Sequence, residues 1–122
     1  MKRALVVLCG VVLLVATAFA GDKGKKEKVS GYLVDVMCSA ELAEKGAAAA
    51  AKHDKKCLNM PDCVASGYAV LTAENQVIKF DAKGNAEAKK ALAASSKDKD
   101  FKVTVSGVVS GETIAVASLQ IK

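Results

Sequence analysis

Five stretches of the chain have the apolar pattern typical of β-strands, either rich in β-forming residues or alternating between apolar and polar residues. The first stretch, Val29 to about Met37, has apolar residues on both faces and predicts a buried strand, in which Gly31 indicates a bulge or bend. Glu74-Asn75 and Ser110-Gly111 are turn sequences that predict two hairpins. The remaining predicted strands are Tyr68 to Ala73, Gln76 to Asp81, Phe101 to Ser106 and Glu112 to Ile121.

Helical patterns fall between the first two strands and between the third and fourth. Ser39 and Asn85 are the polar residues expected to cap the two main helices, and alanine has the highest helix propensity. A proline suits the first position of a short helical turn. The predicted helical segments are Ser39 to about Lys45, the alanine run 47 to 51, Pro61 to Ser66, and Ala86 to about Ser95.

The predicted order is therefore strand, helical insert, strand, strand, helix, strand, strand. This order predicts a mainly β fold with helical insertions, namely a five-stranded, partly open barrel of the OB type. We expect a single OB-like domain over residues 29–122, with the insert at about 38–66. About a hundred residues suffice for one domain with one modest core.

The N-terminus has the three parts of a secretory signal peptide over residues 1–20. Lys2 and Arg3 precede an apolar run, and Ala18-Phe19-Ala20 supplies the small residues of a cleavage site. A retained membrane anchor is the alternative, but the apolar run is shorter than the roughly 20 residues of a spanning helix. We therefore expect an exported protein, periplasmic or secreted, with no membrane span after cleavage. Residues 21–28 are expected to form a flexible, Lys-rich arm.

Composition narrows the classes of partner. The net charge of +5 falls to +3 when Lys2 and Arg3 leave with the signal peptide, and no arginine occurs after position 3. Arginine and aromatic side chains carry most base recognition and stacking, and the mature chain has few aromatics. Nucleic-acid binding is therefore only a remote alternative, and the expected partner is another cell-envelope protein. The mature aromatics are Tyr32, Tyr68, Phe80 and Phe101.

One short segment holds all the mature cysteines and the one histidine: Cys38, His53, Cys57 and Cys63. His53 and Cys57 are four residues apart, which places them on one face if the segment is helical. Three thiolates and an imidazole would complete a tetrahedral zinc site, and a set that includes methionine also suits copper. The spacing is loose, however, and matches neither a paired Cys-x-x-Cys zinc pattern nor a haem attachment motif.

An oxidising compartment favours a disulfide instead, because a small domain gains stability when its unfolded chain is restricted. Loss of Cys9 with the signal peptide leaves three cysteines. Any single disulfide between two of them therefore leaves one free thiol. Pairings of Cys38 with Cys57 or Cys63 would tie the insert to the barrel and are preferred. His53, within a charged run, is expected at the surface, and Met37 and Met60 are expected in the core.

An enzymatic role has less support in the sequence. His53 and Cys57 could form a thiol–imidazole pair, but no third orienting group or oxyanion site accompanies them. Asp35, at a strand end, is expected to cap or to turn the chain. We assign no catalytic residue and expect no cofactor, with zinc or copper as the exception. The predicted function is an exported, non-catalytic structural or interaction domain stapled by a disulfide. The alternatives are a soft-metal-binding envelope module and, more remotely, a thiol enzyme.

Four segments give the chain a family resemblance. They are Gly31 to Cys38, His53 to Cys63, Ser66 to Val70 and Val103 to Glu112. In them the chain resembles a group of small, exported bacterial domains with an OB-like layout and a Cys/His-containing insert. The resemblance covers nearly the whole mature chain and implies the fold, but it brings no established activity.

Overall fold

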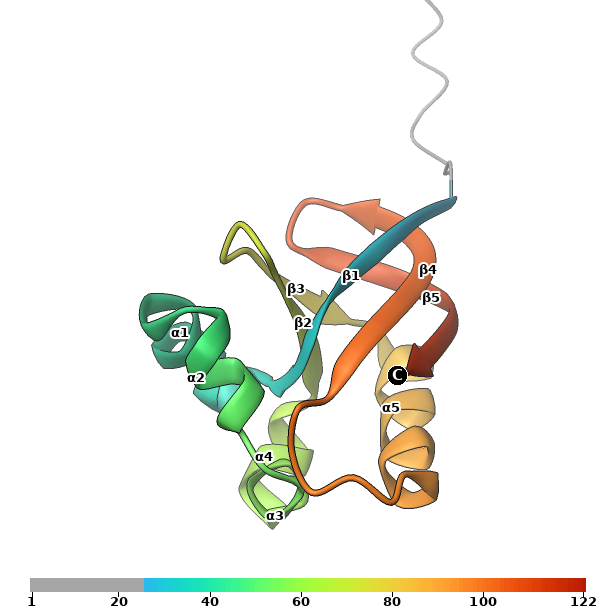
Figure 1. Cartoon of the computed structure of the whole chain (residues 1–122). Coiled ribbons are helices and arrows are strands. Elements are labelled where there is room, and N and C mark those ends of the chain that lie inside the picture. The colour runs from blue at the N-terminus through green and yellow to red at the C-terminus, as the bar shows by residue number, and fades with distance from the viewer. Residues whose placement is uncertain (1–25) are drawn as a thin grey trace, which may run out of the picture.

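The computed structural model describes residues 26–122. The predicted signal peptide and the start of the predicted arm lie outside the described residues. Five strands and five helices follow one another in the expected order, with four of the helices in the insert (Figure 1). They are β1 (Lys26–Asp35), α1 (Val36–Lys45), α2 (Ala47–Lys52), α3 (Lys55–Leu58), α4 (Pro61–Ser66), β2 (Tyr68–Thr72), β3 (Val77–Phe80), α5 (Ala82–Ala94), β4 (Lys102–Ser110) and β5 (Thr113–Ile121).

The strands form one mixed sheet that closes into a ring in the order β1-β2-β3-β5-β4. All neighbours are antiparallel except β3 and β5, which pair in parallel through Lys79 with Thr113 and Phe80 with Ile114. This short parallel contact closes the ring, where the sequence predicted a partly open one. The helical share is also larger than a mainly β fold implies, because the insert forms four helices.

Strand β1 begins at Lys26, so the prediction of a flexible arm through Lys28 is wrong for its last three residues. They pair with Ser106, Gly107 and Val108 of β4 while their side chains stay exposed. Strand pairing uses backbone groups, so charged side chains at the solvent face do not prevent it. Farther along, β1 also pairs with β2.

Glycine is required at two close approaches within the sheet. A Cβ at Gly31 would lie 2.1 Å from the carbonyl oxygen of Leu71, and one at Gly107 would lie 2.1 Å from that of Ala115. The bulge in the sheet lies opposite Ser106/Gly107 of β4, where β5 has the extra residue Ala117, whereas β1 keeps its register with both neighbours at Gly31. The bulge predicted at Gly31 is therefore absent from β1.

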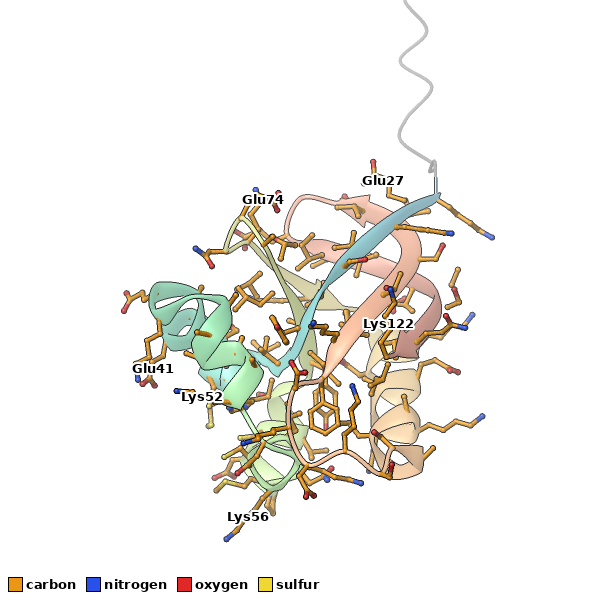
Figure 2. The ribbon with its side chains drawn as sticks, viewed as in Figure 1. Glu27, Glu41, Lys52, Lys56, Glu74 and Lys122 are labelled. Carbon is orange, nitrogen blue, oxygen red and sulfur yellow. The ribbon has the colours of Figure 1, made fainter. Side chains whose placement is uncertain are left out.

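Two apolar clusters hold the fold together. The larger one fills the ring and includes Leu33, Phe101 and Val105, with Ala88 and Leu92 packed against it from α5. The smaller one, Val34, Leu42, Ala50, Ala69 and Leu71, lies between β1–β2 and helices α1 and α2, which stand beside those strands in Figure 1. Charged side chains such as Glu41, Lys52, Lys56 and Glu74 point outward (Figure 2).

Both main helices begin earlier than the sequence predicted. Asp35 rather than Ser39 caps α1, and Asp81 rather than Asn85 caps α5. Asn85 instead accepts a hydrogen bond from the backbone N–H of Tyr68 at 2.8 Å, and the Ser39 hydroxyl donates to the carbonyl of Val36. In each case the carboxylate that ends a strand takes the capping position, because its oxygen accepts from the free N–H groups of the first turn.

Within residues 26–122, no helix is both long enough and apolar enough to cross a membrane.

Candidate functional site

The site is built around Asp35, at the junction of β1 and α1. Its side chain is fully buried, and its Oδ2 accepts the backbone N–H of Cys38 at 3.0 Å. This bond is the N-cap of α1, which confirms the capping role expected for Asp35. A buried carboxylate is costly unless it is paired, so its other oxygen needs a partner.

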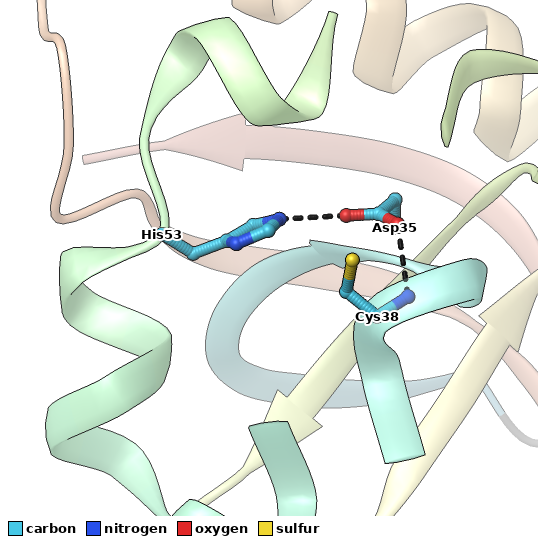
Figure 3. Close-up of side chains that lie close together, drawn as sticks. All are labelled: Asp35, Cys38 and His53. Carbon is cyan, nitrogen blue, oxygen red and sulfur yellow. Dashed lines mark hydrogen bonds and ion pairs between the residues drawn. The ribbon is translucent and has the colours of Figure 1, made fainter. Parts of the chain in front are cut away.

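His53 supplies that partner from the junction of α2 and α3. Its Nε2 lies 2.6 Å from Asp35 Oδ1, and its side chain is only 9% exposed (Figure 3). The prediction of a solvated surface histidine is therefore wrong. The charged run around His53 is real, but the chain turns there between two short helices and directs the imidazole inward, toward Asp35.

Cys38 completes a set of three potential metal ligands. A carboxylate oxygen of Asp35, the Sγ of Cys38 and a ring nitrogen of His53 all lie within 4.8 Å of one another. In Figure 3 the Cys38 sulfur points into the space between the other two side chains. Tetrahedral zinc, with bonds of about 2.0 to 2.3 Å, places its ligand atoms about 3.3 to 3.8 Å apart. The cluster thus has nearly the size that a metal ion requires.

The other two cysteines have different surroundings. Cys63, on α4, is buried, and its thiol lies near enough to Asp35 and Cys38 to shift the pKa of both, although it is not one of the three ligand atoms within 4.8 Å of one another. Cys57, on α3, is instead hydrogen-bonded to Asp54, the residue that caps its own short helix. No disulfide joins any two of these three cysteines in the described part of the chain. The structure therefore brings Cys38 and His53 together at Asp35, with Cys63 next to this group and Cys57 on a separate short helix.

The electrostatics of the cluster keep Asp35 ionised and the thiols protonated. Burial alone would raise the pKa of Asp35, but hydrogen bonds from His53, the Cys38 backbone and the thiols of Cys38 and Cys63 outweigh it and lower the pKa to about 2. Burial, followed by the charge and hydrogen bond of Asp35, raises the pKa of Cys38 to about 12. Burial and then the hydrogen bond to Asp35 also raise the pKa of Cys63.

These shifts bear on thiol chemistry. A cysteine nucleophile works as the thiolate and is normally activated by a lowered pKa. Cys38 and Cys63 next to ionised Asp35 have the opposite environment, and the pKa of Cys57 is raised too, first by its hydrogen bond to Asp54 and then by burial. A metal ion would reverse this, because its positive charge displaces the thiol protons and balances the carboxylate.

Sequence reasoning missed Asp35 as a potential ligand. The available signal was a single charge at the end of a strand that is apolar on both faces, which pointed to a cap and nothing more. The methionines were also misplaced: Met37 is 60% exposed and Met60 is 49% exposed, although core positions were predicted. Both lie at the start of short helices, where the apolar clusters do not reach them.

No family model matches the chain, and no curated protein or solved structure matches it. A proposal for its function therefore rests on the fold and on the cluster around Asp35.

Proposed function

We propose that this protein is an exported, non-catalytic module that binds one zinc ion through Asp35, Cys38 and His53, with Cys63 as the fourth ligand. The observation that carries the proposal is the convergence of three ligand atoms within 4.8 Å at a fully buried carboxylate. Such a group of side chains is costly to bury without a compensating partner, and a divalent cation is a strong one.

The donor set favours zinc. One carboxylate oxygen, one imidazole nitrogen and thiolate sulfurs are all ordinary zinc ligands, and zinc imposes no geometry beyond a tetrahedron. Four protein ligands would leave no open position for water or substrate, which is typical of structural rather than catalytic zinc sites. Copper also binds imidazole and thiolate, but a carboxylate in the set suits it less than a third soft donor would.

The surroundings of the ligands support the proposal. Asp35 Oδ2 is occupied by the Cys38 backbone N–H, so Oδ1 alone would bind the metal, and its orientation is already set. Hydrogen bonds of this kind orient metal ligands in proteins. The metal would replace the direct contact between Asp35 Oδ1 and His53 Nε2, now 2.6 Å long, which would open by about 1 Å.

Two further features belong to the proposal. The strand order β1-β2-β3-β5-β4, with a helix between β3 and β4, supports an OB-like architecture in which the helical insert follows the first strand. The charged, apolar and small-residue segments of the first twenty residues support export. The metal site would then belong to a cell-envelope module, as the resemblance to small exported domains also implies.

The test is zinc binding by the reduced protein produced from the full-length chain. Titration against a chromophoric zinc chelator should give one equivalent of tightly bound zinc. His53→Ala and Cys38→Ser should each weaken binding at least 100-fold, because each removes a direct ligand, whereas the matched control Cys57→Ser should bind as the parent does. Cobalt(II) in place of zinc should give a thiolate-to-cobalt absorption band, lost in Cys38→Ser.

Two results would overturn the proposal. One is zinc binding that is equal in the parent, His53→Ala and Cys38→Ser proteins. The other is metal analysis of the purified protein that finds stoichiometric copper in place of zinc.

A further inference from the structure

Two of the three thiols in the insert are neighbours of each other. Cys38 and Cys63 each shift the pKa of the other and both shift that of Asp35, so the three side chains are neighbours. Backbone bonds hold their helices together: Val36 N–H donates to the Gly67 carbonyl at 2.9 Å, and Met37 N–H donates to the Ser66 hydroxyl at 3.1 Å. The start of α1 is thus fixed against the end of α4, and these are the helices that carry the two cysteines.

The two thiols differ in access to solvent. Cys38 is partly exposed, whereas Cys63 is only 4% exposed. A dithiol with one accessible and one enclosed sulfur can react in sequence, with the accessible sulfur meeting an external disulfide first and the enclosed one resolving the mixed disulfide. Cys57 is held by Asp54 on a separate short helix, so it is not placed to take either role.

We propose that Cys38 and Cys63 are a redox pair whose disulfide excludes the metal, so that oxidation of the insert releases zinc. This inference rests on the proposed function for the metal, but the pairing of the two cysteines does not. Under this proposal Cys38 and Cys63 are the site of oxidation. The same site then exists in two alternative states, one with the disulfide and one with bound metal.

The reaction is thiol–disulfide exchange with a disulfide of the glutathione class. Each protein thiol first loses its proton, to solvent or on binding zinc. The Cys38 thiolate then attacks one sulfur of the oxidant, forms a mixed disulfide and expels one thiolate. The Cys63 thiolate then attacks the Cys38 sulfur, forms the internal disulfide and expels the second thiolate. Two electrons pass from the protein sulfurs to the oxidant. In the zinc-loaded protein the two expelled thiolates take their protons from solvent, and zinc leaves as the divalent ion.

Loss of the metal follows from ligand chemistry. The thiolate is the form that binds metal, and a disulfide sulfur carries no negative charge. Oxidation therefore leaves only Asp35 and His53, which is half of the proposed four-ligand set. Those two can return to the direct contact at 2.6 Å that they make in this structure.

The experiment compares reduced and oxidised protein made from the full-length chain. Oxidised glutathione should yield a product lighter by two hydrogens, and peptide mapping should place the cross-link between Cys38 and Cys63. Zinc affinity, measured against the chromophoric chelator, should fall at least 100-fold on oxidation and return after treatment with dithiothreitol. The matched control Cys57→Ser should behave as the parent does. Cys63→Ser should instead retain one glutathione on Cys38.

The outcomes separate the two proposals. A cross-link that contains Cys57, or unchanged zinc affinity after formation of the Cys38–Cys63 bond, overturns the redox inference and leaves zinc binding by the reduced protein intact. A Cys38–Cys63 bond that forms in a protein whose reduced form binds no zinc overturns the proposed function and the metal-release step, and it leaves only a structural disulfide.

Discussion

The ring of strands and the helical insert are stabilised in different ways. The ring encloses a continuous apolar cluster built from all five strands and α5. The insert, residues 36–66, consists of helices of 10, 6, 4 and 6 residues, and helices this short are marginal on their own in water. Its own apolar cluster is smaller, and it also encloses the polar group around Asp35. Apolar burial thus organises the ring, while the insert depends on buried polar contacts as well.

Apolar packing of Leu58 and of the smaller cluster joins the two regions, and several polar links add to it. Tyr68 O–H, on β2, donates to the Leu58 carbonyl at 2.9 Å. Two backbone bonds join the insert to the segment before β4: Lys55 N–H to the Asp98 carbonyl and Asp100 N–H to the Ala51 carbonyl. Such links fix position more than they add free energy, since each contributes about 1 kcal/mol net. The insert is therefore the region whose order a metal or a disulfide would change most.

The largest expected effect comes from two matched core truncations. Leu92→Ala, in the fully buried cluster of the ring, should lower the free energy of unfolding by about 4 kcal/mol, because it leaves a cavity that the closed sheet cannot fill. Leu42→Ala, in the smaller cluster of the insert, should cost about 2 kcal/mol, since short helices can shift to close the space. Chemical denaturation of the metal-free protein measures both. Equal losses would show that the insert packs as rigidly as the ring.

The second effect concerns Asp35 in the metal-free protein. Asp35→Ala should cost about 3 kcal/mol, because it removes the cap of α1 and leaves the enclosed His53 without its partner. Amide hydrogen exchange should show the loss of protection mainly in the insert, with β4 and β5 little affected. Asp35→Asn keeps a capping oxygen and should cost less. Uniform loss of protection in all five strands would contradict a cluster that organises the insert locally.

Acid should remove part of the same stabilisation. The pKa of Asp35 is lowered from 3.8 to about 2 on folding, so its ionised form stabilises the native state above pH 4 and this contribution is lost as the pH falls from about 4 to 2. The shift corresponds to about 2 kcal/mol. Thermal unfolding followed by circular dichroism between pH 5 and 2 would measure it, with Asp35→Asn as the control that lacks this titration. Parallel pH curves for the two proteins would refute this source of acid sensitivity.

The same contrast explains how far sequence reasoning reached. Alternating apolar residues predicted the strands and their order, and the turn at Glu74-Asn75 is present, with Asn75 at a φ of 60°. The apolar pattern of a strand and the residues of a turn are each contained in one short segment, so they can be recognised without knowing the rest of the fold. The closure of the ring by β3 and β5 depends on contacts between distant segments and was not predicted.

The candidate site shows this limit more sharply. Cys38, His53 and Cys63 were recognised as ligand types, but Asp35 was assigned only a capping role, and His53 was expected at the surface. Asp35 and His53 are 18 residues apart and meet only because two short helices, α1 and α2, reverse the chain between them. A contact between two residues so far apart leaves no periodic pattern in the sequence. A charge at the end of a strand with two apolar faces could have been treated as a sign of a buried partner.

The smallest expected effects come from two helix caps, one in each region. Asp81 Oδ1 accepts the Gly84 N–H at 2.9 Å and also the Val116 N–H of β5 at 3.2 Å, so it joins α5 to the ring. Asp54 accepts the Cys57 N–H through Oδ1, at 2.8 Å, and so acts within the four-residue α3. Asp81→Ala should therefore cost about 1 to 2 kcal/mol of global stability. Asp54→Ala should change the global melting temperature little.

Hydrogen exchange distinguishes the two cap variants, because a cap matters only as far as its helix is coupled to the rest of the molecule. Asp81→Ala should weaken protection in α5 and in its neighbour β5 together, since one carboxylate serves both. Asp54→Ala should weaken protection only around α3, and zinc should restore it if His53, the residue before Asp54, becomes a metal ligand. If Asp54→Ala lowered global stability as much as Asp81→Ala does, the insert would fold as one unit with the ring. The two regions would then not differ in how they are stabilised.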